Sequence, residues 1–86
     1  MKIGFHRHFD KQFAKLSIKQ KEQFQARLKL FAADRYNPKL NNHALQGKYS
    51  GYRSINVSGD LRAVFFEHTS DHIEFDYIGT HNKLYK

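Results

Sequence analysis

The sequence predicts an α+β fold, with two N-terminal helices packed on a mainly antiparallel, four-stranded sheet. Three observations favour it. Apolar residues alternate with polar ones at the N-terminus, recur with helical spacing over residues 10–33, and alternate again in three segments after residue 50. Turn-forming residues separate these last segments, as in an antiparallel meander. The expected order is therefore strand, helix, helix and three strands (β-α-α-β-β-β).

The first strand is expected over residues 2–9, where apolar residues alternate with glycine and histidine. Asp10 is the expected N-cap of a short helix, because Phe9, Phe13 and Leu16 then share one helical face. Such an apolar stripe typically packs on a core. We therefore assign this helix to the scaffold.

The second helix is expected over residues 18–33, with Ser17 as its N-cap and apolar side chains at helical spacing. Asn37-Pro38 follows, and proline disfavours helical geometry in the residue before it. A polar loop over residues 39–50 then leads into the strand-rich half. Loops on a rigid scaffold often carry function.

Three strands are expected in the C-terminal half, over residues 52–57, 61–68 and 72–78. The second of them contains the continuous apolar run Ala63–Phe66, which is typical of a strand covered on both faces. We therefore place that strand at the centre of the sheet. The alternation of the last strand slips at Ile78, which indicates a bulge.

Length and composition indicate one small domain over residues 1–86. Hydrophobic residues make up 40% of the chain, including eight Phe and five Tyr, which is enough to fill a thin core. The absence of cysteine excludes disulfides, thiolate nucleophiles and cysteine-based zinc sites. No apolar run approaches the ~20 residues of a membrane span. We expect a cytoplasmic protein without metal or cofactor.

The chain is strongly basic, with 15 Lys and Arg against eight Asp and Glu and a net charge of +7. A field of this sign attracts polyanions, so the expected partner is a nucleic acid or an acidic protein. A basic balance that serves solubility alone is the alternative. Charge does not distinguish RNA from DNA.

Imidazole and carboxylate groups in the C-terminal half suit metal-independent RNA cleavage. That reaction requires a base for the 2′-hydroxyl proton, an acid for the leaving oxygen, and cations around the phosphate. His81 and His43 are the candidates for proton transfer, because imidazole titrates near neutral pH. Asp60 can orient an imidazole or accept a proton, although aspartate in a turn is also common for backbone reasons.

Cationic and aromatic residues accompany these groups. Arg53 and Arg62 lie on adjacent arms of the expected hairpin, where a guanidinium can hold two phosphate oxygens. Lys48 lies near them in the sequence. Tyr85 can stack on a base or donate a hydrogen bond to phosphate. Arg53 can alternatively pair with an acidic residue of the sheet.

Four segments of the C-terminal half resemble the RelE superfamily of type II toxin–antitoxin toxins, especially its YafQ-like branch. They are His43–Gly47, Gly51–Arg53, Val57–Arg62 and Ile78–Tyr85. The resemblance implies a RelE-like microbial RNase fold. It also implies an endoribonuclease that enters the ribosomal A site and cuts mRNA there, by 2′-hydroxyl attack without a metal. A cognate antitoxin is expected to neutralise it.

Position by position, the YafQ-like pattern matches His43, Asp60 and His81 as acid–base groups and Tyr85 as the terminal aromatic residue. The sequence departs from the pattern at Asn56, where the branch usually has a histidine. Asparagine does not exchange a proton near neutral pH but can hydrogen-bond a nucleotide. The residues that correspond to the RelE branch instead are Lys48, Arg53, Arg62 and Tyr85.

The hypothesis from the sequence is therefore a ribosome-dependent mRNA interferase that inhibits translation. Its partners would be mRNA, the ribosome and an antitoxin with an acidic or amphipathic segment that complements the basic surface. One alternative is a non-enzymatic toxin like the related ParE group, which acts on DNA gyrase. The other is a basic nucleic-acid-binding module.

Overall fold

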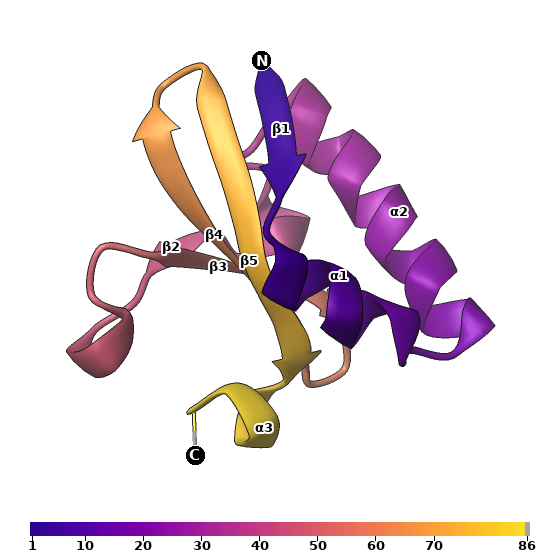
Figure 1. The fold of residues 1–86 in the computed structure, drawn as a ribbon. Helices are drawn as coiled ribbons and strands as arrows, with labels where there is room; N and C mark the ends of the chain where they lie inside the picture. Colours follow the sequence, from indigo (N-terminus) through magenta and orange to yellow (C-terminus); the bar gives the residue numbers. More distant parts are fainter. Residues whose placement is uncertain (86) are drawn as a thin grey trace.

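A five-stranded sheet with the order β1-β5-β4-β3-β2 forms the centre of the protein in the computed structural model, which describes residues 1–85. The strands are β1 (Lys2–Phe5), β2 (His43–Ala44), β3 (Arg53–Ser58), β4 (Leu61–Thr69) and β5 (His72–Thr80), and the helices are α1 (Arg7–Ala14), α2 (Ile18–Ala33) and α3 (His81–Tyr85). Helices α1 and α2 cover the same face of the sheet (Figure 1). The predicted α+β class is therefore confirmed.

The sheet has one strand more than predicted. The two residues of β2 pair with β3, where His43 lies opposite Ser54 and Ala44 opposite Arg53. So short a strand leaves no period to detect in the sequence. Strand β4 is central, as predicted, and β1 joins β5 in the only parallel pairing among the described strands.

The first strand and first helix divide at a different point from the one predicted. Strand β1 ends at Phe5 and α1 begins at Arg7, so Asp10 lies inside the helix instead of capping it. The N-cap is His6, whose Nδ1 accepts a hydrogen bond of 3.0 Å from the main-chain N–H of His8. Histidine is an uncommon N-cap and aspartate a common one, so the sequence alone favours a helix that begins at Asp10.

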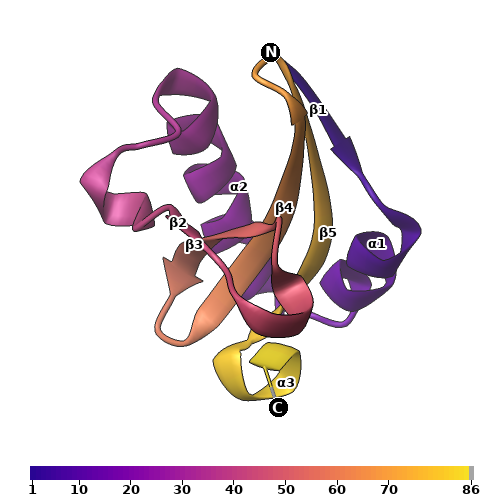
Figure 2. The same ribbon diagram turned by 90° about the vertical axis from the view of Figure 1, so that its left-hand side faces the viewer.

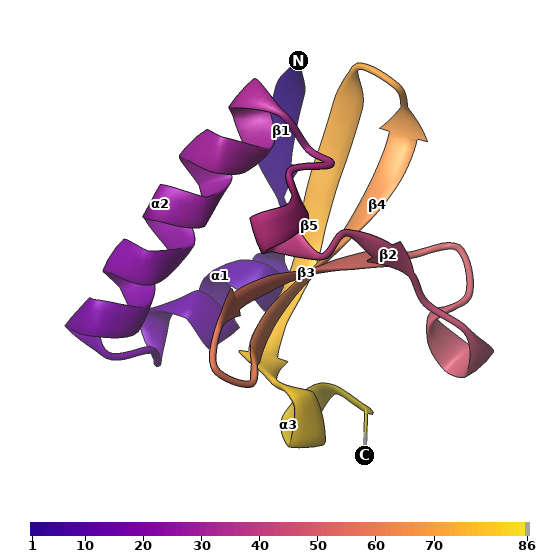
Figure 3. The same ribbon diagram turned by 180° about the vertical axis from the view of Figure 1, so that it is seen from behind.

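Helix α2 has the boundaries that the sequence predicts. Ser17 and Gln20 form a reciprocal capping box, in which each side chain accepts a hydrogen bond from the main-chain N–H of the other residue. From behind, α2 runs alongside the sheet, and the short 3-10 turn η1 (Pro38–Leu40) lies between α2 and β3 (Figure 3). Leu40 is fully buried there and closes that side of the core.

Phenylalanine rings fill the layer between the helices and the sheet. Phe75 on β5 lies at the centre, with ring centroids 5.9 Å from Phe9, 5.6 Å from Phe24, 5.5 Å from Phe31 and 5.3 Å from Phe65. Rings at such separations prefer edge-to-face or tilted contacts over face-to-face stacking, and these contacts fix the helices on the sheet. No helix within residues 1–85 is long and apolar enough to cross a bilayer.

The predicted bulge lies at Asp76 instead of Ile78. Val64 of β4 pairs with Tyr77 of β5, whereas the next residue, Phe65, pairs with Phe75, so Asp76 has no opposite partner. The extra residue explains how Phe75 and Ile78, three positions apart, both turn toward the helices. The bulge also buries Asp76, which is 7% exposed.

A short C-terminal helix, α3, was not predicted. It lies at the end of the sheet opposite the N-terminus (Figure 2). Its anchor is Leu84, which is 3% exposed and packs over Gly79 of β5. A Cβ built at Gly79 would lie 3.4 Å from Leu84 Cδ2, so the leucine packs in contact with the strand at this residue.

Candidate functional site

The C-terminal histidine and the turn aspartate lie side by side. The main-chain N–H of His81 donates a hydrogen bond of 2.9 Å to the carbonyl oxygen of Asp60. Just beside them, Leu61 at the start of β4 pairs with Thr80 at the end of β5. Both His81 and Asp60 are exposed. The two predicted acid–base groups, distant in the sequence, therefore share one end of the sheet.

Arg62 follows on the same end of β4. It lies opposite Asn56 of β3 and opposite Gly79 of β5. Its Nη1 donates to the carbonyl oxygens of Gly59 at 2.8 Å and of Leu61 at 3.2 Å. Among residues 1–85 Arg62 forms no ion pair with a carboxylate. Its charge is therefore available to a phosphate.

Asn56 has an unused hydrogen-bonding atom. Its Oδ1 is buried and has no hydrogen-bond partner among the described residues. A buried acceptor without a partner usually costs about 1–3 kcal/mol, so such atoms often lie at functional sites. Because cross-strand partners lie on the same face, Asn56 and Arg62 form a neighbouring amide and guanidinium.

Tyr85 and His43 are both neighbours of Ser54. The Tyr85 hydroxyl donates a hydrogen bond of 3.2 Å to Ser54 Oγ, and His43 lies opposite Ser54 across β2 and β3. The Tyr85 ring also stands edge-on to the His81 ring, with centroids 4.7 Å apart. Ser54 is fully buried and was not predicted from the sequence. An isolated serine in a strand carries no signal that would have identified it.

The tautomer of neutral His43 follows from its contact. Its Nδ1 lies 2.8 Å from the carbonyl oxygen of Asn41. A carbonyl oxygen only accepts hydrogen bonds, so Nδ1 carries the hydrogen. In the neutral ring Nε2 is then left as an acceptor. His43 is therefore suited to receive a proton, and its exposure leaves it accessible to a substrate.

Tyrosine rings extend the site across the sheet. Lys48 Nζ lies 5.3 Å from the ring centroid of Tyr49, in the 3-10 turn η2 (Gly47–Tyr49). Tyr49 in turn contacts Tyr85 and Tyr77 edge-on, with centroids 5.6 Å apart in both pairs. Burial raises the pKa of Tyr49, and the neighbouring Tyr77 and Tyr85 raise it further. The structure thus connects Lys48 to the site through Tyr49.

Arg53 is placed apart from the other predicted site residues. It pairs with Phe65, whose side chain belongs to the core beneath the helices, so Arg53 extends to the face away from Asn56 and Arg62. Its Nε donates a hydrogen bond of 2.7 Å to Asn42 Oδ1, and its guanidinium lies 5.9 Å from the Tyr36 ring centroid. These contacts secure the loop before β2 instead of joining the site.

Tyr52 and Asp76 form a polar pair next to these tyrosines. The Tyr52 hydroxyl donates a hydrogen bond of 3.1 Å to Asp76 Oδ2, while Asp76 Oδ1 is buried without a partner among residues 1–85. Burial raises the pKa of Asp76, and the adjacent Glu74 adds to the effect. Burial, together with the hydrogen bond to Asp76, raises the pKa of Tyr52 to about 12. Both groups therefore hold their protons more tightly than usual.

Metal ligation has no support among the described residues. Within residues 1–85 no three His, Cys, Asp or Glu side chains gather closely enough to hold a metal ion. What the site offers is imidazole, guanidinium, amide and phenol groups on one end and face of the sheet. Such groups can transfer protons, hold a phosphate and contact a base.

Comparison with known proteins agrees with this fold. All of residues 1–86 match the family described as the bacterial toxin of type II toxin–antitoxin systems, YafQ. No curated protein matches the chain.

Several solved structures have the same fold. The crystal structure of YafQ from E. coli strain BL21(DE3) has a TM-score of 0.80 at 22% identity, covering 98% of this chain and 97% of that chain. A chain of the E. coli DinJ–YafQ toxin–antitoxin complex has a TM-score of 0.76 at 24% identity, covering 98% and 96%. A YoeB/ParE toxin from Agrobacterium tumefaciens has a TM-score of 0.76 at 14% identity, covering 94% and 99%. At these identities the structures show a shared fold, and the match over the full sequence shows the family. The protein belongs to the YafQ family of bacterial toxins of type II toxin–antitoxin systems.

Proposed function

We propose that this toxin is a ribosome-dependent mRNA interferase, an endoribonuclease that cuts mRNA by metal-independent 2′-hydroxyl attack and so inhibits translation. The observation that best supports the proposal is the main-chain hydrogen bond from His81 N–H to the Asp60 carbonyl, because it ties the residue that bears the C-terminal imidazole to the turn that leads to Arg62. The residues proposed for acid–base work and for phosphate binding are then neighbours along the backbone at one end of the sheet.

The proposed reaction is an in-line displacement at phosphorus. The 2′-oxygen forms a bond to phosphorus while the bond to the 5′-oxygen of the next nucleotide breaks, leaving a 2′,3′-cyclic phosphate and a 5′-hydroxyl. One group removes the 2′-hydroxyl proton and another protonates the departing oxygen, and each positioned group contributes roughly a hundred- to ten-thousandfold in rate.

The proposed roles follow from the contacts. Among the described residues no group bonds to His43 Nε2, so His43 is proposed to accept the 2′-hydroxyl proton, and His81 is proposed to exchange the second proton. Asp60 assists His81 electrostatically. Arg62 stabilises the charge that builds on the phosphate, because its guanidinium has no carboxylate partner among the described residues.

Three further residues are proposed to bind the nucleotides. The ring of Tyr85 is held by the bond of its hydroxyl to Ser54, which suits it to stacking on a base. Asn56 offers a partly exposed side-chain amide beside Arg62, and the exposed Lys48 offers a cation to the strand. Arg53 has no place in this proposal, because the register of β3 and β4 puts it on the face of the sheet away from Asn56 and Arg62.

We further propose a cognate antitoxin that covers this basic surface with an acidic or amphipathic segment. The net charge of +7 favours such a segment. The E. coli relative with the same fold has been solved as a DinJ–YafQ toxin–antitoxin complex, which supports a partner of this kind.

The test is expression of the toxin without its antitoxin. Translation should stop, and ribosomes should carry mRNA cut to 2′,3′-cyclic phosphate ends. His81→Ala and Arg62→Ala should abolish both effects. The matched controls are His68→Ala, at the opposite end of β4, and Arg7→Ala, on the exposed side of α1, and both should remain toxic.

Two other outcomes would replace the proposal. Intact mRNA together with DNA damage would indicate a gyrase poison of the ParE type. Normal growth on expression, with only salt-dependent binding of nucleic acid, would indicate a basic binding module.

A further inference from the structure

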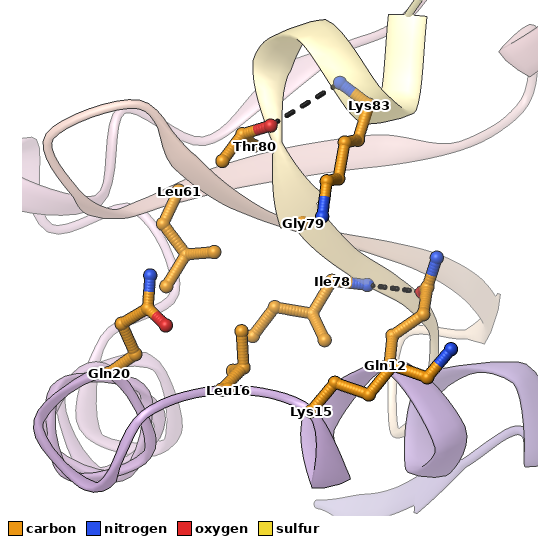
Figure 4. Close-up of a pocket in the computed structure, with 9 residues that line it drawn as sticks. All are labelled: Gln12, Lys15, Leu16, Gln20, Leu61, Ile78, Gly79, Thr80 and Lys83. Carbon is orange, nitrogen blue, oxygen red and sulfur yellow. Dashed lines mark hydrogen bonds between the residues drawn. The ribbon is translucent and has the colours of Figure 1, made fainter.

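A cavity lies beside α3, on the face of the sheet that the helices cover. Its volume is about 290 Å³, and it is enclosed by the end of α1, the start of α2 and the end of β5 with α3 (Figure 4). Leu16, Leu61 and Ile78 form its apolar floor. Polar side chains surround this floor, and none of the residues that line the cavity is acidic.

The two glutamines of the cavity have their oxygens occupied. Gln12 Oε1 accepts a hydrogen bond of 2.9 Å from the main-chain N–H of Ile78, and Gln20 Oε1 accepts one of 3.0 Å from that of Ser17. Each partner is an N–H donor, so the orientation of both amides is determined. Within residues 1–85 neither Nε2 group donates a hydrogen bond, so both remain as donors on residues that line the cavity.

The remaining polar residues also present donors. Thr80 Oγ1 accepts a hydrogen bond of 3.3 Å from the main-chain N–H of Lys83, which leaves the hydroxyl hydrogen available. Figure 4 shows the Lys83 side chain returning from α3 along Gly79, so that its ammonium lies at the cavity. Lys15 lies on the α1 side. Within residues 1–85, neither lysine forms an ion pair.

We propose that this cavity binds a phosphate group. Two ammonium groups, two amide NH₂ groups and one hydroxyl surround it, and the protein itself occupies an oxygen lone pair of each neutral side chain. An anion with several acceptor oxygens matches this set, whereas a cation meets only repulsion.

The cavity adjoins the proposed reaction site. Gly79 lines the cavity and is also the cross-strand partner of Arg62. Helix α3 carries Lys83 at the cavity, while its residue His81 is bonded to Asp60. An RNA strand that crosses α3 therefore brings a phosphate beyond the scissile linkage to Lys83. Binding of an RNA phosphate rests on the proposed function, whereas binding of a free phosphate does not depend on it.

The first experiment titrates ¹⁵N-labelled toxin with inorganic phosphate, at an ionic strength held constant with chloride, and follows NMR chemical shifts. The side-chain NH₂ signals of Gln12 and Gln20 should move and saturate. Lys83→Gln and Lys15→Gln should each weaken binding severalfold. Lys19→Gln removes an exposed lysine from outside the cavity on α2 and should leave the titration unchanged.

The second experiment measures the affinity of His81→Ala toxin for a short single-stranded RNA against salt concentration. Each phosphate contact in single strands contributes about 0.7 to the slope of log K against log salt. Adding Lys83→Gln should lower the slope by about this amount if the phosphate belongs to the strand, whereas adding Lys19→Gln should not. An unchanged slope together with saturable phosphate binding would assign the cavity to free phosphate.

The proposal is overturned if phosphate moves neither glutamine signal and Lys83→Gln leaves the slope unchanged. Failure of the proposed function has a different signature. Toxin that leaves mRNA intact on ribosomes, yet shows saturable shifts of the glutamine signals, would refute the nuclease and retain the phosphate site. Toxin that cuts mRNA, but whose glutamine signals do not move and whose slope is unchanged by Lys83→Gln, would retain the nuclease and refute the phosphate site.

Discussion

The main-chain N–H of His81 is bonded to the carbonyl oxygen of Asp60 at 2.9 Å, so the first residue of α3 is tied to the turn between β3 and β4. This contact uses no side-chain atom. The histidine ring is therefore free for chemistry while its backbone is fixed. The other end of α3 depends on the burial of Leu84.

Leu84→Ala should reduce activity without touching a proposed reacting group. Removing a buried leucine side chain costs about 2–5 kcal/mol, and here the loss releases the helix that carries His81 and Tyr85. We expect a lower Tm and a large loss of mRNA cleavage. Leu84→Met, which nearly conserves volume, should retain both. Full activity in the alanine variant would show that α3 needs no such anchor.

Asn56→His should increase cleavage. The substitution places a titratable ring opposite Arg62, at the position where Asn56 leaves a buried oxygen unpaired. A further group for proton transfer should raise the rate at least about tenfold and add an ionisation to its pH profile. Single-turnover cleavage of ribosome-bound mRNA measures this. A rate equal to that of Asn56→Ala would exclude a chemical role at this position.

Arg53→Ala should affect stability more than cleavage. The substitution removes the hydrogen bond to Asn42 and the contact with Tyr36, at a cost of about 1–3 kcal/mol. Thermal unfolding should show this loss, whereas cleavage at a temperature well below Tm should stay within about twofold of the unsubstituted toxin. Arg62→Ala provides the comparison, with activity lost and Tm little changed. Equal losses of activity would return Arg53 to the site.

Asp76→Asn should stabilise the protein at neutral pH. Because the folded state raises the pKa of Asp76, it holds the proton more tightly than the unfolded chain. Stability from this residue is present below the ordinary pKa of 3.8 and falls as the pH rises through the folded value. The advantage of the variant in urea unfolding should therefore grow from pH 4 to pH 7. An advantage that shrinks over this range would contradict the assignment.

Tyr52 should ionise later than most of the other tyrosines. Its pKa of about 12 predicts a late component in the titration of absorbance at 295 nm, and Tyr52→Phe should remove it. The folded state keeps the phenol proton through the range in which the unfolded chain loses it. Stability from Tyr52 is therefore present below pH 10 and is lost as the pH rises through about 12. Tyr52→Phe should therefore lose less of its free energy of unfolding between pH 10 and pH 12 than the unsubstituted protein does.

Local chemistry explains which elements the sequence predicts well. Ser17 and Gln20 form a capping box within three residues, so the start of α2 can be found without knowledge of the fold. The boundary between β1 and α1 is different. Phe5 and Phe9 are four positions apart, which suits both a strand and a helix, and only packing in the fold decides between them. Helix α3 depends on one buried leucine and has no period to detect.

The site depends on strand register, which no single segment encodes. His81 meets Asp60 because β4 and β5 pair from Leu61 and Thr80 onward, and the bulge at Asp76 sets that alignment. The sequence does indicate that Arg53 is separated from the site, through the alternation of residues along β3. Arg53 lies two positions from Ile55 and therefore on the core side of β3. Asn56 lies three positions from Arg53, so the alternation of a strand puts the two residues on opposite faces.

Pairing of β1 with β5 makes completion of the sheet depend on a segment far along the chain from its first strand. Lys2 of β1 finds its partner only at His72, so the ends of the sheet are joined by contacts of long sequence separation. Closing such a loop precedes any gain from the pairing, and topologies of this kind fold slowly. A growing polypeptide that stops before β5 lacks both the partner of β1 and the strand that delivers His81. Completion of the sheet therefore waits until β5 has been made.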